Sequence, residues 1–468
     1  MTTPNSLQAL MDSKPSFIDH LYNDTLATHP RTRLSLTPVP EVVTNWRDEQ
    51  RAWRESVVLF DQSHHMPETF LAGPDAKRLL SHIGVNSLET FRPGLAKQFV
   101  ACNPRGQMIG ECVLHDLGDC YELISGQPLH DWLRFQAETG GYDVTLTFDP
   151  TTWDDPARGR VNFRYQIDGP QAGAVFDQVV EGDPPDIKFF NTAEVSIAGG
   201  RVLALRHGMA GHRGYELSGP YAEGPQVREA ILAAGAAHGI RAAGSATYFS
   251  AAVESGWISY PLPAIYTGDD MRAFREWLPA DSWEARFPLG GSFVTSNIED
   301  HYVTPYDLGL GRVVKFDHDF IGRAALEAVA ERPPRTKVAL IWAHDDVMRI
   351  LESQFQEGVP FKALTFPQTD YAQMQRDVVS TTSGVPIGLS THGGYTVNEK
   401  VVVSYGIVDV DYATPGTEVL VTWGEPGGGS RKPQVELHRQ TQVRATVASV
   451  PFARSVRDLK RASRGAVG

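Results

Sequence analysis

The sequence is poor in cysteine and lacks any long apolar run. Its 468 residues include three cysteines, Cys102, Cys112 and Cys120, with no CxxC pair among them. This odd count argues against a disulfide framework or a zinc site and is typical of reduced thiols. No segment approaches the ~20 apolar residues of a membrane-spanning helix, and the N-terminus lacks the basic and apolar regions of a secretory signal. These absences predict a soluble, cytoplasmic protein that does not enter a membrane.

Basic residues are also too few for a nucleic-acid partner. The chain has 43 Lys and Arg against 56 Asp and Glu, which gives a net charge of −13. Because phosphate binding needs clustered Lys and Arg, we expect no nucleic acid. The length is too great for one compact core and predicts two to four domains.

Several familiar catalytic motifs are missing. Gly309-Leu310-Gly311 lacks the third glycine of a dinucleotide-binding loop, and there is no Walker loop, HExxH or nucleophile elbow. His64 and His65 are adjacent, and neighbouring side chains on a strand point to opposite faces. We therefore expect no metal site.

One pattern occurs three times: a short alternating strand runs into Gly-Pro-x-Ala and then into an apolar-periodic helix. The three copies cover residues 69–76, 165–172 and 215–222. Proline is favoured at the first helical position, where its missing N–H costs nothing. Coincidence among 31 prolines and 43 glycines is the alternative. As a real pattern, it predicts helices layered on sheets in an α+β architecture.

The character of the chain changes after Glu331–Arg335. Segments rich in β-branched residues follow, separated by Gly/Pro turns. They cover residues 337–343, 400–410, 417–423 and 442–452. This part is predicted to be a separate all-β domain, either a small barrel or a sandwich.

Polar residues interrupt several apolar stretches. Gln62 and His65 follow an apolar strand, Glu216 lies between apolar neighbours, and Tyr248 precedes Trp257 by nine residues. Together with the Phe189-Phe190 pair, this mixture suits a flat heteroaromatic ligand with hydrogen-bonding edges. The alternative is that the aromatic residues belong to the hydrophobic core.

A resemblance then gives these residues a context. The segment 305–311, continued by 315–317 and 319–326, resembles the "Glu-x-Gly-Leu … Asp-Phe-Ile-Gly-x-x-Ala-Leu" segment of the folate-dependent aminomethyltransferase superfamily, typified by the T-protein of glycine cleavage. Residues 60–66 are similar to that family's "Phe-Asp-x-Ser-His-Met", and 413–417 add support. The resemblance extends from about Trp46 to Phe452. It implies a three-domain cloverleaf, in which two α/β-layer domains surround a folate site and a C-terminal all-β barrel caps it.

The resemblance also implies domain limits. They are an N-terminal extension (1–45), a folate-binding domain (46–160, completed by 245–330), a second domain (161–244), the β-barrel (336–455) and a tail (456–468).

Departures from the aminomethyltransferase pattern narrow the expected function. The family's "Gly-Gly-x-x-Asp-Asp" turn reads Gly106 to Glu111 here, so that one acid has become Gly110. In the helix "Arg-Asp-Thr-x-Arg-x-Glu-x-Gly", Tyr248 replaces an arginine, which suits an aromatic substrate. The chain looks most like the tetrahydrofolate-dependent aromatic O-demethylases that act on syringate, vanillate and 3-O-methylgallate. Segments shared with them are 52–54, 206–211, 262–269 and 291–294.

This resemblance implies transfer of a methyl group from a methoxylated aromatic acid to tetrahydrofolate, without a metal, by a monomer or homodimer. Tyr248 would donate a proton to the departing oxygen, because a phenol in an apolar pocket stays protonated at neutral pH. Gln62 and His65 would orient the substrate oxygens. Glu216 would bind the pterin edge, with Phe189 against the ring and Trp257 as a wall.

The group that binds the substrate carboxylate is left open. Vanillate-type relatives, as aligned, use an arginine in the strand at 123–127, but this chain has Ser125 and Gly126 there. Because a buried carboxylate without a partner is costly, another cation is expected, with Arg286 and Arg33 as candidates. Arg286 is equally compatible with a solvated surface position. The small residues leave room beside the ring and predict a preference for syringate, with 3-O-methylgallate intermediate and vanillate last.

Two alternatives remain. One is an aminomethyl or N-methyl transferase, against which the acid missing at Gly110 argues. The other is a non-enzymatic, folate-binding assembly protein, against which the missing "Lys-Gly-Cys-Tyr" signature argues, since residues 315–318 read Lys-Phe-Asp-His.

Overall fold

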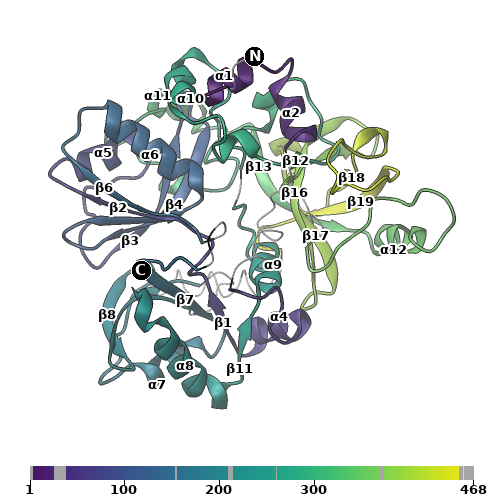
Figure 1. Cartoon of the computed structure of the whole chain (residues 1–468). Coiled ribbons are helices and arrows are strands. Elements are labelled where there is room, and N and C mark those ends of the chain that lie inside the picture. The colour runs from purple at the N-terminus through teal and green to yellow at the C-terminus, as the bar shows by residue number, and fades with distance from the viewer. Residues whose placement is uncertain are drawn as a thin grey trace.

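The computed structural model describes residues 4–25, 38–152, 155, 157–208, 214–259, 261–368, 374–452 and 457. Three lobes surround the central helix α9 (Ser245–Ser255), with two α/β lobes on the left of Figure 1 and a β-barrel on the right. The predicted α+β cloverleaf with a C-terminal all-β domain is confirmed.

The first lobe is an antiparallel sheet covered by two helices (Figure 1). Its strand order is β3-β4-β5-β2-β6. The strands are β2 (Glu68–Ala72), β3 (Ala96–Cys102), β4 (Met108–Asp116), β5 (Tyr121–Ser125) and β6 (Thr145–Asp149), and the helices are α5 (Ala76–Ile83) and α6 (Gln127–Thr139). The predicted apolar face of α5 is buried: Ala76, Leu79, Leu80 and Ile83 are at most 3% exposed.

The second lobe is a sheet in the order β11-β1-β7-β10-β9-β8. Its elements are β1 (Val57–Asp61), β7 (Asn162–Asp168), β8 (Thr192–Ile197), β9 (Gly200–Arg206), β10 (Tyr215–Pro220) and β11 (Ile240–Ala243), with helices α7 (Ala172–Val179) and α8 (Gly224–Gly235). Strand β1 pairs antiparallel with β7 and parallel with β11. The expected grouping of 46–160 is therefore wrong for β1, because its strand partners come from residues 162–168 and 240–243.

The strand-to-helix turns at residues 73–74 and 169–170 require the glycine rather than the proline. Gly73 has φ +117° and Gly169 has φ +134°, and an added Cβ would lie 2.5 Å from Asp143 O or 2.6 Å from Ser56 O respectively. Both prolines precede the N-cap residue, so the prediction that they begin the helix is wrong. Pro74 and Pro170 belong to the turn, because the glycine before each proline lies against another backbone segment and the helix begins only after the N-cap residue.

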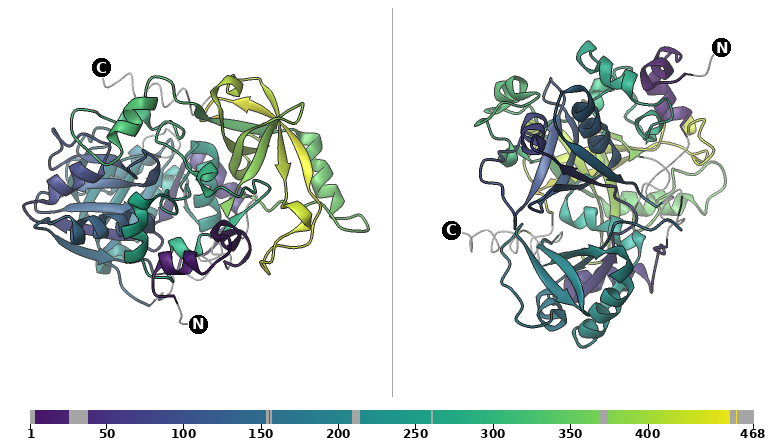
Figure 2. Two further views of the ribbon diagram at one scale, coloured as in Figure 1. Left: turned by 90° about the horizontal axis from the view of Figure 1, so that it is seen from above. Right: turned by 60° about the vertical axis from the view of Figure 1, so that its left-hand side comes forward.

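The third lobe is a closed barrel, which decides between the barrel and sandwich alternatives. Its order is β13-β17-β16-β15-β18-β19, and it lies to one side of both α/β lobes in Figure 2. The elements are β13 (Arg335–Trp342), β15 (Asp377–Thr381), β16 (Pro386–Thr396), β17 (Val401–Asp409), β18 (Glu418–Trp423), β19 (Thr441–Ala448) and helix α12 (His344–Ser353). The sequence did not reveal β15 and β16, because glycines and polar residues interrupt the alternation of β16.

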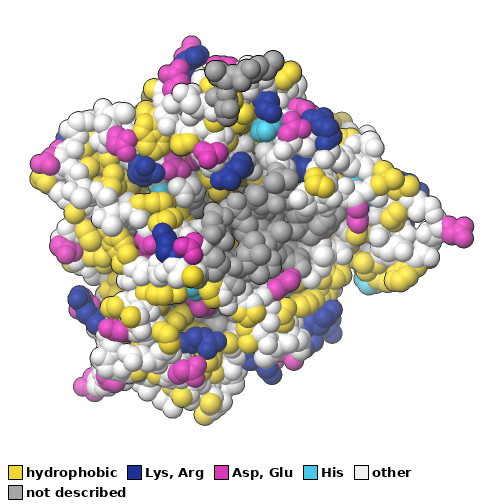
Figure 3. Space-filling view, in the orientation of Figure 1, with side chains coloured by type: hydrophobic (Ala, Val, Ile, Leu, Met, Phe, Trp, Pro, Cys, Tyr) yellow, Lys and Arg dark blue, Asp and Glu magenta, His cyan; other side chains and the backbone are white. Residues whose placement is uncertain are grey.

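Shorter elements join the lobes. They are α1 (Leu7–Asp12), α2 (Phe17–Asn23), α4 (Trp46–Glu55), α10 (Arg272–Trp277), α11 (Arg323–Val329), β12 (Leu289–Gly290) and β14 (Met374–Gln375). Among the described residues, no helix has the length and apolar character needed to cross a membrane. On the face in Figure 3, acidic side chains are scattered among basic ones.

Candidate active site

A cavity of about 1270 Å³ is lined by residues of all three lobes. Its walls come from the ends of β1 and β5, the strands β3, β4, β7 and β10, helix α9, the loop around 308–315 and the barrel residues Lys337 and 449–451. A single drug-sized ligand occupies a pocket of roughly 300–1,000 Å³. This cavity is therefore large enough for two molecules.

Three of the predicted residues meet in one wall of this cavity. Gln62 follows β1 and its N–H donates to Arg164 O at 2.8 Å, while Tyr248 lies in the first turns of α9. Gln62 Nε2 contacts Tyr248 Oη at 3.4 Å, and the rings of His65 and Tyr248 meet edge to face with centroids 4.8 Å apart. Tyr248 follows Gln62 and His65 by more than 180 positions in the sequence, and the packing of α9 beside the end of β1 brings the three residues together.

A buried amide pair supports this wall. Gln62 Nε2 donates to Gln166 Oε1 at 2.7 Å, and the two residues are 3% and 0% exposed. Among the described residues, Gln62 Oε1 and Gln166 Nε2 have no hydrogen-bond partner. Buried polar groups are normally paired, so Gln62 Oε1 can accept from a ligand hydroxyl and Gln166 Nε2 can donate to a ligand oxygen in the cavity.

His65 is a neutral imidazole at physiological pH. Burial lowers its pKa to about 3, and the positive charges of His64 and Arg160 act in the same direction. A neutral imidazole offers one donor and one acceptor. His64 instead contacts Thr152 Oγ1 with Nδ1 at 3.0 Å, so the two rings have different partners. In the described part of the chain, no group of three or more His, Cys, Asp and Glu residues could hold a metal ion.

The predicted pterin ligand Glu216 is held in place by a buried ion pair. Arg164 Nη1 donates to Glu216 Oε1 at 2.6 Å, and the same guanidinium contacts Glu68 at 3.1 Å and Glu122 at 2.9 Å. Burial raises the pKa of Glu216, but the charge of Arg164, together with two nearby histidines, outweighs it and the net pKa is lowered. An ionised carboxylate therefore forms part of the cavity wall.

The alternation of apolar and polar residues along β7 positions Arg164 and Gln166 in the site. The sequence analysis did not use this alternation. Phe163, Tyr165 and Ile167 face the apolar core, while Arg164, Gln166 and Asp168 are buried on the opposite face. Gln166 pairs in register with Phe60 on one side and with Glu216 on the other. One strand thus links the amide cluster to the acid.

The aromatic residues Phe189 and Trp257 are wall residues rather than core. They are 48% and 37% exposed, respectively, and both line the cavity. The ring of Phe189 lies 5.1 Å from that of Phe190, and Trp257 Nε1 donates to Glu111 Oε1. An exposed ring face in a cavity is available for a planar ligand.

Glu111 is a further site residue that sequence reasoning missed. It lines the cavity, and burial raises the pKa of its carboxyl group. A Cβ added to Gly110 would lie 3.2 Å from the Cβ of Leu129 in α6, on the other face of β4. The acid lost at Gly110 therefore faces away from the cavity. The sequence analysis took the acid missing at Gly110 as evidence against aminomethyl chemistry. The structure removes that argument, because Glu111 keeps a carboxyl group in the cavity wall.

The predicted carboxylate-binding residues have different positions. Ser125 lines the cavity, is 5% exposed and lies 3.0 Å from His130 Nε2. Arg286 is exposed, is absent from the cavity wall and donates to Ser282 O at 3.3 Å. Its expected role is not supported, because it lies in the short turn Glu284–Arg286, whose buried side is formed by the other two residues. Arg33 lies outside the described residues, so its role stays a prediction.

Comparisons with known proteins place this geometry in a family. The model of the GCVT N-terminal domain matches residues 27–263. Syringate O-demethylase from Sphingobium sp. (strain NBRC 103272 / SYK-6) is 42% identical over 450 residues, which cover 96% of each chain. This chain belongs to the GCVT family. The predicted membership of the glycine-cleavage T-protein superfamily is confirmed.

More distant relatives share the same framework. A sesamin methylene transferase from Sinomonas sp. (strain No.22) is 31% identical over 398 residues, 82% of each chain. An aminomethyltransferase from Saccharopolyspora erythraea is 27% identical over 420 residues, 87% of this chain and 89% of the relative. The crystal structure of the glycine cleavage system aminomethyltransferase T from Bartonella henselae superposes with a TM-score of 0.59 at 20% identity, over 89% of this chain and 91% of that one. That structure establishes the common GCVT fold.

Proposed function

We propose that this protein is a tetrahydrofolate-dependent O-demethylase of methoxylated aromatic acids, with syringate as the preferred substrate. The observation that carries the proposal is the meeting of Gln62, His65 and Tyr248 in a cavity that also contains the carboxylate of Glu216. The relationship to syringate O-demethylase at 42% identity supports it. The products are a catechol and 5-methyltetrahydrofolate.

The residues present fit a folate molecule. Glu216 Oε1 is bound by Arg164, while Oε2 makes no hydrogen bond to any residue that the structure describes. An ionised oxygen of this kind accepts the N–H groups of a pterin edge with charge-assisted bonds. Phe189 lies against the ring and Trp257 walls the site. Tetrahydrofolate, when bound, supplies the N5 lone pair that accepts the methyl group.

The aromatic acid binds beside the folate, against the wall formed by Gln62, Gln166 and His65. Gln62 Oε1 accepts from its phenol O–H, while Gln166 Nε2 and the neutral imidazole of His65 hold its oxygens. Alignment of the methyl carbon for in-line transfer supplies ~7–11 kcal/mol. Tyr248 donates its proton to the departing oxygen, which contributes roughly a hundred- to ten-thousand-fold in rate.

The small residues Ser125 and Gly126 support syringate as the preferred acid. Both line the cavity, and the Ser125 N–H contacts Pro67 O at 3.5 Å, two residues after His65. Without a long side chain there, a second methoxy group has space. Arg33 is retained as the proposed partner of the carboxylate, in place of Arg286.

Aminomethyl transfer is the second candidate, favoured by the carboxyl group of Glu111 in the cavity. One panel separates the two activities. The protein is incubated with tetrahydrofolate and, in parallel, with syringate, 3-O-methylgallate, vanillate, a methylenedioxybenzene and an aminomethyl donor, and products are identified by mass. Catechol formation from the methoxylated acids supports the proposal. Turnover of the aminomethyl donor alone would replace it with the second candidate.

A further inference from the structure

A second, much smaller cavity of about 10 Å³ shares a wall with the large one. A space of this size admits about one water molecule. Within the described part of the chain, His65 and Tyr248 are the two residues that line both cavities. Their side chains therefore separate the proposed reaction site from the small cavity. The other residues that line the small cavity are Val39, Phe60, Asp61, Ala243, Gly244 and Ser245.

The sheet of the second lobe brings polar groups to the small cavity. Phe60 on β1 pairs in parallel register with Ala243 on β11, and both strands end within one residue of this pair. Beyond it, one chain segment continues as Asp61 and the other leads to Ser245. Ser245 is the first residue of α9, and Tyr248 follows three positions later on the same side of the helix. Asp61, Ser245 and Tyr248 thus meet at one edge of the sheet.

Ser245 carries a buried hydroxyl that has no hydrogen-bond partner among the described residues. The residue is 3% exposed, and its backbone N–H donates to Pro40 O at 3.1 Å, which fixes its position. Buried polar groups are normally paired, so an unpaired hydroxyl beside a space for one water indicates a water site. A buried water makes about three hydrogen bonds, and the side chains of Ser245, Tyr248 and Asp61 offer that number.

Asp61 connects the small cavity to solvent. Its side chain is 27% exposed, whereas Phe60 and Ala243 beside it are 1% and 5% exposed. Asp61 Oδ1 accepts from the Ser63 N–H at 3.0 Å, and this bond fixes the carboxylate at the end of β1. A carboxylate that contacts both solvent and a cavity can pass protons between them.

The proposed reaction removes one proton from Tyr248 in every turnover. The bond between the methoxy carbon and its oxygen breaks with the electron pair left on the oxygen, while the N5 lone pair of folate forms the new bond to carbon. The oxygen takes the Tyr248 proton, and N5 releases its own proton to solvent. Because a phenol is protonated at neutral pH, one solvent proton must return to the Tyr248 oxygen before the next turnover.

We propose that Ser245 and Asp61 position a water molecule in the small cavity, and that this water returns the proton to Tyr248 after each methyl transfer. The proton passes from solvent to the Asp61 carboxylate and through the water to the Tyr248 oxygen, while the Ser245 hydroxyl holds the water. Neither Ser245 nor Asp61 lines the large cavity, so both act through Tyr248 as positioning residues. The inference rests on the proposed function, because it takes Tyr248 to be the proton donor.

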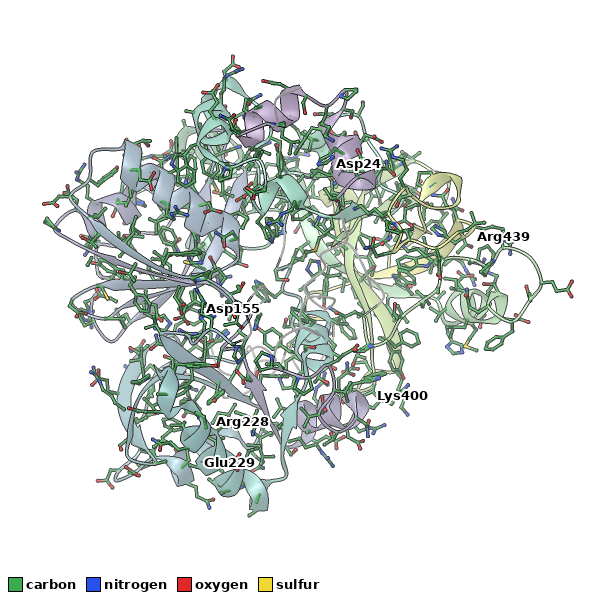
Figure 4. All side chains as sticks on the ribbon, viewed as in Figure 1. Asp24, Asp155, Arg228, Glu229, Lys400 and Arg439 are labelled. Carbon is green, nitrogen blue, oxygen red and sulfur yellow. The ribbon has the colours of Figure 1, made fainter. Side chains whose placement is uncertain are left out.

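The test compares the first turnover with continuous turnover, because Tyr248 is already protonated when the first turnover begins. Rapid quenching with enzyme in excess over syringate measures one methyl transfer, and steady-state assays with syringate in excess measure kcat. The variants are Ser245→Ala, Ser245→Thr and Asp61→Asn, which keeps the oxygen that accepts from Ser63. Glu229→Gln is the matched control, since Glu229 is an exposed acid on α8 of the same lobe and lines neither cavity (Figure 4).

We expect the first-turnover rates of Ser245→Ala and Asp61→Asn to stay within about twofold of wild type, while kcat falls about tenfold or more. Ser245→Thr keeps the hydroxyl and should retain most of kcat, and Glu229→Gln should retain both rates. Equal losses in the two rates would overturn the inference, because general damage to the site slows the first methyl transfer as well. An unchanged kcat in Ser245→Ala and Asp61→Asn would also overturn it. Either result leaves the proposed function intact, whereas a wild type that transfers no methyl group even in the first turnover refutes the proposed function and the inference together.

Discussion

Replacing Tyr248 by phenylalanine removes one hydroxyl and leaves the ring where it packs. The ring contacts Phe60 at 5.3 Å and His65 at 4.8 Å between centroids, and neither contact needs the oxygen. A positioned general acid contributes roughly a hundredfold or more, so we expect kcat for syringate to fall about 100-fold, equivalent to about 2.7 kcal/mol. KM should change little, because the proton is donated only in the transition state.

The loss of stability should be small by comparison. The contact of Gln62 Nε2 with Tyr248 Oη is long at 3.4 Å, and a hydrogen bond contributes about 1 kcal/mol or less in such a case. Tyr412→Phe is the control, because Tyr412 lies in a barrel turn outside the cavity. Steady-state rates and thermal melts of the three proteins separate catalysis from folding. A kcat for Tyr248→Phe equal to that of Tyr412→Phe would refute the assigned role.

Three other substitutions test the remaining walls. Glu216→Gln removes a charge-assisted bond of about 1.5–3 kcal/mol, so the Kd for tetrahydrofolate should rise at least roughly tenfold while the Kd for syringate stays constant; an unchanged folate Kd would remove Glu216 from the site. The pKa of His65 is lowered to about 3, so the unfolded chain binds more protons than the folded one between about pH 3 and 6.5, and wild type should lose stability relative to His65→Gln as the pH falls through that window. If the free energies of unfolding of wild type and His65→Gln, measured in urea, changed equally with pH, this prediction would be contradicted. Ser125→Arg fills the space beside the ring and adds a cation, so the ratio of kcat/KM for syringate to that for vanillate should fall about tenfold, and an unchanged ratio would argue against Ser125 as a specificity residue.

Local patterns were sufficient to predict much of the fold. The apolar face of residues 76–83 and four strands of the barrel follow from periodicity and β-branched composition, because each depends on neighbours in the sequence. The position of β1 does not. Its parallel partner β11 lies about 180 residues away, and no local pattern records which distant strand completes a sheet.

The site divides in the same way. Gln62, His65, Glu216 and Tyr248 carry unusual polar groups in apolar surroundings, and the structure places all four in one cavity. No sequence pattern singled out Arg164, because its role depends on ion pairs with three glutamates that lie on different strands. The exposure of Arg286 depends on which side of a short turn is buried, and the sequence at that turn is compatible with either side.

The central claim is that the methoxy carbon of an aromatic acid moves to folate. The most direct measurement uses syringate with ¹³C in its methoxy groups, unlabelled tetrahydrofolate and stoichiometric enzyme, with products followed by NMR and mass spectrometry. The account predicts that the label appears in the methyl group of 5-methyltetrahydrofolate in step with demethylated acid, and that Tyr248→Phe slows both together. Demethylated acid without label in the folate, or labelled folate only from an aminomethyl donor, would contradict it.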